Sequence, residues 1–148
     1  GMPAYEVSNH ARDGAQSRHN LIYWRYGDYI GIGPGAHGRL TLAGKRWATE
    51  AYSNPKQWLS RVGEDASERP RFALSRDAQA QEYLLMGLRL KEGVSLSRFS
   101  ALRGRPLADH AIRNLTDLGM ISQKEDIIIV SDQGFMILNA VISALLDG

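Results

Sequence analysis

The sequence predicts an α+β fold in which a strand-rich first half precedes a mostly helical second half. The chain has 148 residues, which is enough for one ordinary domain or two small ones. Short alternating segments and glycine loops fill the first half, and apolar residues recur every three to four positions in the second half. Hydrophobic residues make up 43% of the chain and charged residues 23%, which is typical of a globular protein.

The first half is predicted to contain short strands and a hairpin. Residues 5–8 and 29–32 alternate as strands do, and the second of these segments runs into the glycine-rich loop 33–38. Residues 39–42 and 46–52 are separated by a turn sequence, Ala43-Gly44-Lys45, so they indicate a hairpin.

A short helix and a boundary follow the hairpin. Asn54 is a typical N-cap and Pro55 a typical first helical residue, so the sequence predicts a helix over 55–62. The next segment is charged and punctuated by proline, as linkers are. We therefore expect three parts, which are residues 2–62, a linker at 63–74 and a second domain at 75–148.

The second half is predicted to contain four helices and one hairpin. Serine and glycine at the predicted ends act as caps, and the hairpin flanks the turn Lys124-Glu125-Asp126. The order of three helices, a two-stranded wing and a final helix is typical of a winged-helix-like domain. The predicted elements are helices over 75–93, 95–102, 107–118 and from 132 onward, and a hairpin of 120–123 with 127–130. The inward residues are predicted to be Leu107, Ala111, Leu115 and Leu118 in the third helix, and Phe135, Leu138, Ile142 and Leu145 in the last.

Charge and cysteine usage exclude several classes of function. Eighteen Lys and Arg against sixteen Asp and Glu give a net charge of +2, too small an excess to indicate nucleic acid or an anionic membrane as the partner. The chain has no cysteine, so it alone offers no disulfide, thiolate zinc site or iron–sulfur ligand. No apolar run approaches the roughly 18–20 residues of a membrane span, and no signal peptide is visible, so we expect a cytoplasmic location.

The glycine loop is the first candidate site. Gly33, Gly35 and neighbouring glycines follow a predicted strand, and glycine lets the backbone approach a ligand closely. The residues after the loop are predicted as strand rather than helix, so this is not the dinucleotide fingerprint. A plain structural loop is the alternative interpretation.

The segment from Arg18 to Trp24 is the second candidate. An imidazole at His19 beside Tyr23 and Trp24 could ligate a heme iron while the aromatic rings cover the macrocycle. Most single histidines are hydrogen-bonded structural residues, which is the alternative.

The predicted helix over 107–118 is the third candidate, as a DNA-reading helix. With its apolar stripe inward, its outer face would show Asp109, His110, Arg113 and Asp117. Two acids on that face oppose phosphate, so the sequence favours a structural role and argues against nucleic acid as a partner.

Several segments, taken together and in order, resemble the HemW-type heme chaperones. These are a branch of the radical S-adenosylmethionine proteins that is similar to oxygen-independent coproporphyrinogen III oxidases. The resemblance covers nearly the whole chain and rests on residues 5–12, 18–24, 29–38 and the tail from 82 onward.

This resemblance implies both a fold and a set of site residues. The first half would be the last strands of a partial β/α barrel, and the tail the winged-helix-like C-terminal domain of the family. The motif matched by His19, Asn20, Tyr23 and Trp24 implies heme binding, with His19 as the residue on the heme iron. The segment containing Gly33, Gly35, Ala36 and His37 would form a wall of the S-adenosylmethionine pocket.

The chain also departs from the family pattern. The three-cysteine motif that holds the family's [4Fe–4S] cluster is absent, and so are the earlier barrel strands, which indicates missing upstream sequence. His10 stands where an aromatic residue is common, and Ser17 where a cysteine is common. We therefore expect this chain alone to be non-catalytic, to hold no cluster and to bind S-adenosylmethionine weakly or not at all.

The resemblance implies that the parent protein delivers heme to respiratory hemoproteins. One alternative is that the chain is part of an oxygen-independent coproporphyrinogen III oxidase. Another is that it is a winged-helix nucleic-acid-binding module. Because a barrel remnant leaves sheet edges uncovered, a homodimer of this chain is also expected.

Overall fold

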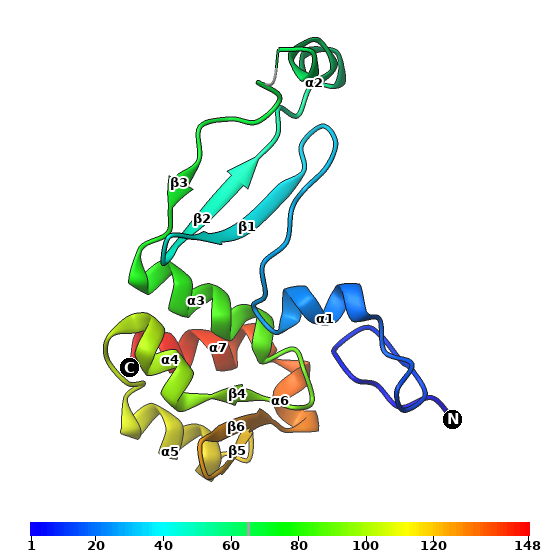
Figure 1. Ribbon diagram of the computed structural model, residues 1–148. Helices are drawn as coiled ribbons and strands as arrows, with labels where there is room; N and C mark the ends of the chain where they lie inside the picture. The colour runs from blue at the N-terminus through cyan, green and yellow to red at the C-terminus, as the bar shows by residue number, and fades with distance from the viewer. Residues whose placement is uncertain (65) are drawn as a thin grey trace. The chain divides into compact units, whose positions relative to one another are not determined.

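The computed structural model describes residues 1–64 and 66–148, which form two compact units. One unit consists of residues Gly1–Tyr26 and Arg76–Gly148, and the other of Gly27–Ser75 (Figure 1). The mixture of helices and antiparallel sheets confirms the α+β class. The N-terminal 26 residues thus pack with the second half of the chain. The division into domains at 63–74 stays a prediction.

The unit formed by Gly27–Ser75 is built on a three-stranded antiparallel sheet in the order β1-β2-β3. Its elements are β1 (His37–Leu42), β2 (Lys45–Glu50), α2 (Pro55–Val62) and β3 (Phe72–Ala73). Ala43 and Gly44 join β1 to β2 with positive φ angles of 49° and 74°, as a tight two-residue hairpin turn requires. The predicted hairpin is therefore confirmed.

Helix α2 is confirmed with the predicted cap. The Asn54 side chain accepts hydrogen bonds from the backbone N–H groups of Lys56 and Gln57, at 3.0 and 3.1 Å, and Pro55 is the first helical residue. Such a cap contributes about 1 kcal/mol to the helix.

One prediction for this unit needs correction. Residues 29–32 do not form a strand, because only Tyr29 pairs, in an isolated bridge with Arg39. Within residues 63–74, Phe72–Ala73 form β3, which pairs with β2. The sheet is antiparallel throughout, whereas strands of a β/α barrel are parallel, so the sheet gives no support to the barrel assignment.

The other unit combines helices with a second antiparallel sheet in the order β4-β6-β5. Its core contains large apolar side chains, among which Leu84, Leu88, Phe99, Ile128 and Leu145 are fully buried. Each such side chain contributes about 1.5–3 kcal/mol by burial. The elements are α1 (Arg18–Trp24), α3 (Arg76–Gly87), β4 (Val94–Ser95), α4 (Leu96–Arg103), α5 (Asp109–Asp117), β5 (Ile121–Lys124), β6 (Ile127–Val130), α6 (Asp132–Met136) and α7 (Leu138–Asp147).

Helix α4 and the hairpin of β5 with β6 agree with the predictions. Ser95 caps α4 through a hydrogen bond from the Arg98 N–H, and Gly104 ends it with a φ of 85°. In the hairpin, Ile121 pairs with Val130, and Lys124 pairs with Ile127. No helix of the described residues is long and apolar enough to cross a membrane.

Other elements of this unit differ from the predictions. The predicted strand at 5–8 is reduced to isolated bridges of Ala4 with His10 and of Glu6 with Leu90, because no neighbouring strand runs alongside it. The helix predicted over 75–93 ends at Gly87. Neither α1 nor β4 was predicted from the sequence.

The last two helical predictions also change in detail. Leu118 is 66% exposed, since α5 instead buries Ala111, Ile112 and Leu115. The helix predicted from residue 132 breaks at Ile137, whose φ of −126° is not helical, and becomes α6 and α7.

Candidate functional site

Helix α1 carries the predicted motif and begins at a serine cap. The Ser17 hydroxyl accepts a hydrogen bond from the Asn20 N–H at 3.3 Å, which satisfies one of the free donors of the first turn. Just after the helix, Tyr26 has a φ of 59° and is buried, with its ring 6.0 Å from that of Tyr83 in an edge-to-face contact. The C-terminal end of α1 is thereby anchored beside α3 (Figure 1).

One ion pair and one hydrogen bond to the backbone fix the residue that follows α1. The guanidinium of Arg25 donates two hydrogen bonds to the carboxylate of Glu92, at 2.8 and 2.7 Å. Arg98 donates to the backbone carbonyl of Arg25 at 3.2 Å. These contacts hold a short helix that buries none of its own residues.

His19 and Tyr23 lie one turn apart on α1 and form a pair. The Tyr23 hydroxyl is hydrogen-bonded to His19 Nε2 at 2.7 Å, and the two rings meet edge to face with centroids 4.7 Å apart. His19 is exposed, and no hydrogen bond to its Nδ1 is found among the described residues. The imidazole therefore keeps one ring nitrogen open to solvent.

Trp24 and Asn20, the other residues of the motif, are not part of this hydrogen-bonded pair. Trp24 is five positions after His19, which puts it on another side of the helix. The guanidinium of Arg89 lies 5.5 Å from the Trp24 ring centre. The indole Nε1 is buried and has no acceptor among the described residues.

The glycine loop belongs to the unit formed by Gly27–Ser75, and its glycines are needed for different reasons. A Cβ at Gly31 would lie 2.3 Å from the His37 carbonyl oxygen, and one at Gly38 would lie 2.5 Å from the Thr49 hydroxyl. Gly33 and Gly35 instead have positive φ angles of 107° and 72°. The loop is thus shaped by backbone packing as much as by any ligand.

Part of the loop's hydrogen-bonding capacity is used within the protein. The Gly35 N–H donates to the Tyr52 carbonyl at 3.0 Å, and the Ala36 N–H donates to the Gly33 carbonyl at 3.2 Å. His37 is exposed and begins β1. These two backbone N–H groups are therefore not available to a ligand.

A cavity of about 190 Å³ lies against this loop. Of the four predicted residues, Gly33 and Ala36 line it, and Gly35 and His37 do not. Trp58 on α2 also lines it, a residue that the sequence indicated only as core or cover. The full lining is Gly31, Ile32, Gly33, Ala36, Thr49, Ala51, Trp58, Ser67 and Glu68.

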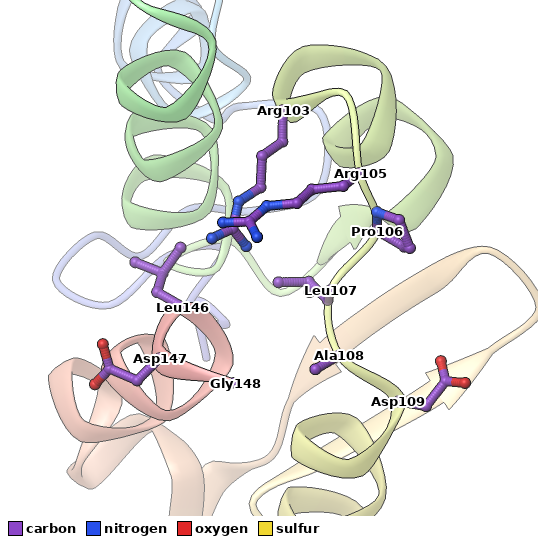
Figure 2. A pocket seen from close by; sticks show the side chains of 9 residues that line it. All are labelled: Arg103, Arg105, Pro106, Leu107, Ala108, Asp109, Leu146, Asp147 and Gly148. Atoms are coloured by element: carbon purple, nitrogen blue, oxygen red, sulfur yellow. The ribbon is translucent and has the colours of Figure 1, made fainter.

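A larger pocket, of about 590 Å³, contains none of the residues predicted for the heme motif or the glycine loop. Figure 2 shows the side chains of Arg103 and Arg105 converging in it above Leu146. Arg103 is paired with Asp77 at 3.2 Å, and Asp109 and Asp147 also line the pocket. Its charges are therefore mixed.

Comparisons with known proteins match this chain to a single group. Residues 74–137 match the family model of the HemN C-terminal domain. Heme chaperone HemW of Bacillus subtilis (strain 168) is 33% identical over 150 residues, which are 99% of this chain and 38% of that protein. Heme chaperone HemW of Escherichia coli (strain K12) is 31% identical over 159 residues, with the same two coverages, 99% and 38%.

Two further matches come from a eukaryotic relative and a solved structure. The mitochondrial radical S-adenosyl methionine domain-containing protein 1 of Danio rerio is 42% identical over 100 residues, 64% of this chain and 22% of that protein. The structure of coproporphyrinogen III oxidase (HemN) from Escherichia coli, a radical SAM enzyme, matches with a TM-score of 0.66. That match covers 98% of this chain and 37% of the enzyme at 17% identity, so it shows the fold alone.

These matches define a class, the radical S-adenosylmethionine proteins that carry a HemN-type C-terminal domain. Within this class, the chain belongs to the HemW-type heme chaperone family and corresponds to its C-terminal part. The chain spans 38% of the length of its Bacillus subtilis relative.

Proposed function

We propose that this chain binds heme through His19 and that its parent protein is a heme chaperone. The observation that carries the proposal is the exposed imidazole on α1, held by the Tyr23 hydroxyl at one nitrogen and open at the other. Relatives that carry the name heme chaperone, in Bacillus subtilis and Escherichia coli, support it.

The pair of His19 and Tyr23 suits iron ligation chemically. A neutral imidazole that donates its Nε2–H to the tyrosine oxygen keeps the lone pair of Nδ1 for a metal. Metal-binding histidines usually donate their second N–H to a fixed acceptor, which sets the tautomer and the ring orientation. Tyr23 is placed to be that acceptor. Heme is then the cargo of the protein, and Asn20 and Trp24 complete the motif.

The glycine loop is proposed as one wall of an S-adenosylmethionine pocket in the parent protein. Gly33 and Ala36 line a cavity of about 190 Å³, which is below the range of roughly 300–1,000 Å³ that encloses a drug-sized ligand. Further walls would have to come from outside these residues. The [4Fe–4S] cluster of the parent likewise needs ligands from elsewhere, since this chain has no cysteine.

Delivery of heme to respiratory hemoproteins is the proposed role of the whole protein. We also propose that residues 75–148 form a winged-helix-like domain. The helices α3, α4 and α5 precede the hairpin of β5 with β6, α6 and α7 follow it, and the strands form the sheet β4-β6-β5. The assignment of the first half to a partial β/α barrel rests on the family resemblance alone.

A heme titration followed at the Soret band tests the proposal. Addition of hemin to the 148-residue chain should shift the Soret band, and His19→Ala should abolish the shift because the iron loses its nitrogen ligand. His110→Ala, which removes another exposed histidine, is the matched control and should leave the shift intact. Identical spectra for the wild type and His19→Ala would remove His19 from this role.

A further inference from the structure

A groove of about 450 Å³ lies in the same unit as α1. It is formed where α6 meets α7, together with a residue of the N-terminal segment and a residue just after α3. Its lining is Val7, Arg89, Phe135, Met136, Ile137, Leu138, Asn139 and Ala140.

The groove exposes large apolar side chains. Met136 is 86% exposed, Ile137 is 50% exposed and Val7 is 45% exposed. Single exposed apolar residues are common, but several that share one concave surface indicate a binding site. The break at Ile137 creates this surface, because an unbroken helix would not present consecutive residues in this way.

The groove also carries positive charge without an acidic side chain in its lining. No ion pair joins Arg89 to a carboxylate among the described residues. Helix α7 begins at Leu138 without a side-chain cap, so its first turn adds a weak positive potential. In the pocket beside Arg103, by contrast, two aspartates line the wall. The groove therefore fits an apolar molecule that carries a carboxylate.

Arg89 connects the groove to the candidate heme motif. Arg89 lines the groove, and its guanidinium lies 5.5 Å from the ring centre of Trp24, a residue of that motif. A porphyrin combines an apolar macrocycle with carboxylates at one edge. It offers apolar area to Met136 and Ile137 and a charged hydrogen-bond acceptor to Arg89.

We propose that this groove binds the porphyrin of the heme cargo, with Met136 and Ile137 against the macrocycle and Arg89 on a propionate. The inference rests on the proposed function, since that is what selects a porphyrin among carboxylate-bearing apolar molecules. It adds a contact surface that does not depend on iron.

Iron-free protoporphyrin IX separates this surface from iron ligation. Its fluorescence should change on binding to the 148-residue chain, and Arg89→Gln should weaken binding about tenfold, as expected for the loss of a charged hydrogen bond. Arg105→Gln removes an arginine outside the groove and should have no effect. With protoporphyrin dimethyl ester, which lacks the free carboxylates, Arg89→Gln and the wild type should bind equally.

A second pair of variants tests the apolar contact. Met136→Gln should weaken binding several-fold, because the macrocycle loses apolar contact area. Leu118→Gln changes another exposed apolar residue, outside the groove, and is the matched control. Both Met136 and Leu118 are at least 66% exposed, so neither change should unfold the protein.

The outcomes distinguish this inference from the proposed function. Equal affinity of the wild type, Arg89→Gln and Met136→Gln for protoporphyrin IX, or no binding by the wild type, would overturn the groove assignment. His19→Ala should bind iron-free protoporphyrin IX like the wild type, since no iron is present. Loss of porphyrin binding in Arg89→Gln together with an unaltered heme spectrum in His19→Ala would support the groove and refute ligation by His19.

Discussion

The buried guanidinium of Arg46 is paired with the carboxylate of Asp28. Arg46 is 7% exposed and donates to Asp28 at 2.8 Å and to the Gly27 carbonyl at 2.9 Å. Asp28 also accepts hydrogen bonds from the backbone N–H and the hydroxyl of Thr41, at 2.7 and 2.9 Å. This network ties the residues before β1 to both strands of the hairpin.

The network makes the stability of this region depend on pH. Partial burial by itself would raise the pKa of the Asp28 carboxyl, but the hydrogen bonds from Thr41 and the charge of Arg46 outweigh it and lower the pKa. A carboxyl with a lowered folded-state pKa stabilises the fold above its unfolded pKa of about 3.9. That stabilisation is lost as the pH falls through the folded-state pKa.

Asp28→Asn should therefore lower the free energy of unfolding at pH 7 by about 1 kcal/mol, a modest value because Asp28 is partly exposed. Urea unfolding followed by tryptophan fluorescence measures the difference. The difference should shrink as the pH falls through the lowered pKa of the Asp28 carboxyl, because the wild-type side chain then also becomes protonated. Asp13→Asn, at an exposed site, is the control, and an equal loss in both variants would contradict the role of Asp28.

The sequence predicts the individual site residues only in part. The spacing of His19 and Tyr23 places them in one motif, and a helical spacing of four makes their hydrogen bond possible. Arg89 and Trp58 carry no comparable signal, because their neighbours are distant in the sequence. The family resemblance directs attention to α1 and the glycine loop, and only the folded chain adds the groove.

Among the elements, α2, α4 and the hairpin of β5 with β6 were predicted well from local capping and turn signals. Asn54 and Ser95 begin α2 and α4, Gly104 ends α4, and a residue with positive φ, Glu125, closes the hairpin of β5 with β6. The two-residue strands β3 and β4 were missed because only their pairing partners define them. The break at Ile137 was missed because the apolar pattern continues across it.

The turn between β5 and β6 also holds the start of α4. The Asp126 carboxylate accepts hydrogen bonds from the hydroxyls of Ser95 and Ser97 and from the Ser97 N–H, at 2.5, 2.8 and 2.8 Å. These hydrogen bonds lower the pKa of Asp126, those from Ser95 contributing most. The hairpin and the helix are thereby joined at one carboxylate.

A substitution at Gly134 tests how closely α6 packs against Met120 and Val130. A Cβ at this position would lie 2.1 Å from the Met120 carbonyl oxygen and 2.8 Å from a methyl group of Val130. Gly134→Ala should lower the free energy of unfolding by about 3 kcal/mol or more, since the backbone must move.

Urea unfolding measures this cost, and Gly63→Ala provides the same chemical change in open space. Gly63 has a φ of −69°, and nothing lies within 4 Å of an added Cβ, so its substitution should be neutral or slightly stabilising. Similar stabilities for the two variants would show that the helix α6 does not pack as described.

At the scale of the whole molecule, the two units differ in how they are stabilised. The large buried apolar side chains belong to the unit that contains α3 and α7. In the unit formed by Gly27–Ser75, the buried residues among those described are small or polar. They are Gly38, Arg46, Ala48, Thr49 and Ala51. Apolar burial therefore stabilises this second unit much less.

Amide hydrogen exchange should reveal this difference. We expect β1 and β2 to exchange faster than α3 and α7, because regions with few buried apolar contacts open at lower free energy. Mass spectrometry of peptides from 37–50 and 76–88 compares them directly. Equal protection of the two peptides would contradict a weaker second unit.

The path of the chain gives the segment from Gly27 to Ser75 the character of an insertion. The chain leaves one compact unit after Tyr26 and re-enters the same unit at Arg76. The entropy of closing a flexible loop rises by only about 0.6 kcal/mol for each doubling of its length. The segment can accordingly lengthen, shorten or be exchanged over evolutionary time at little cost to the apolar core that receives both of its ends.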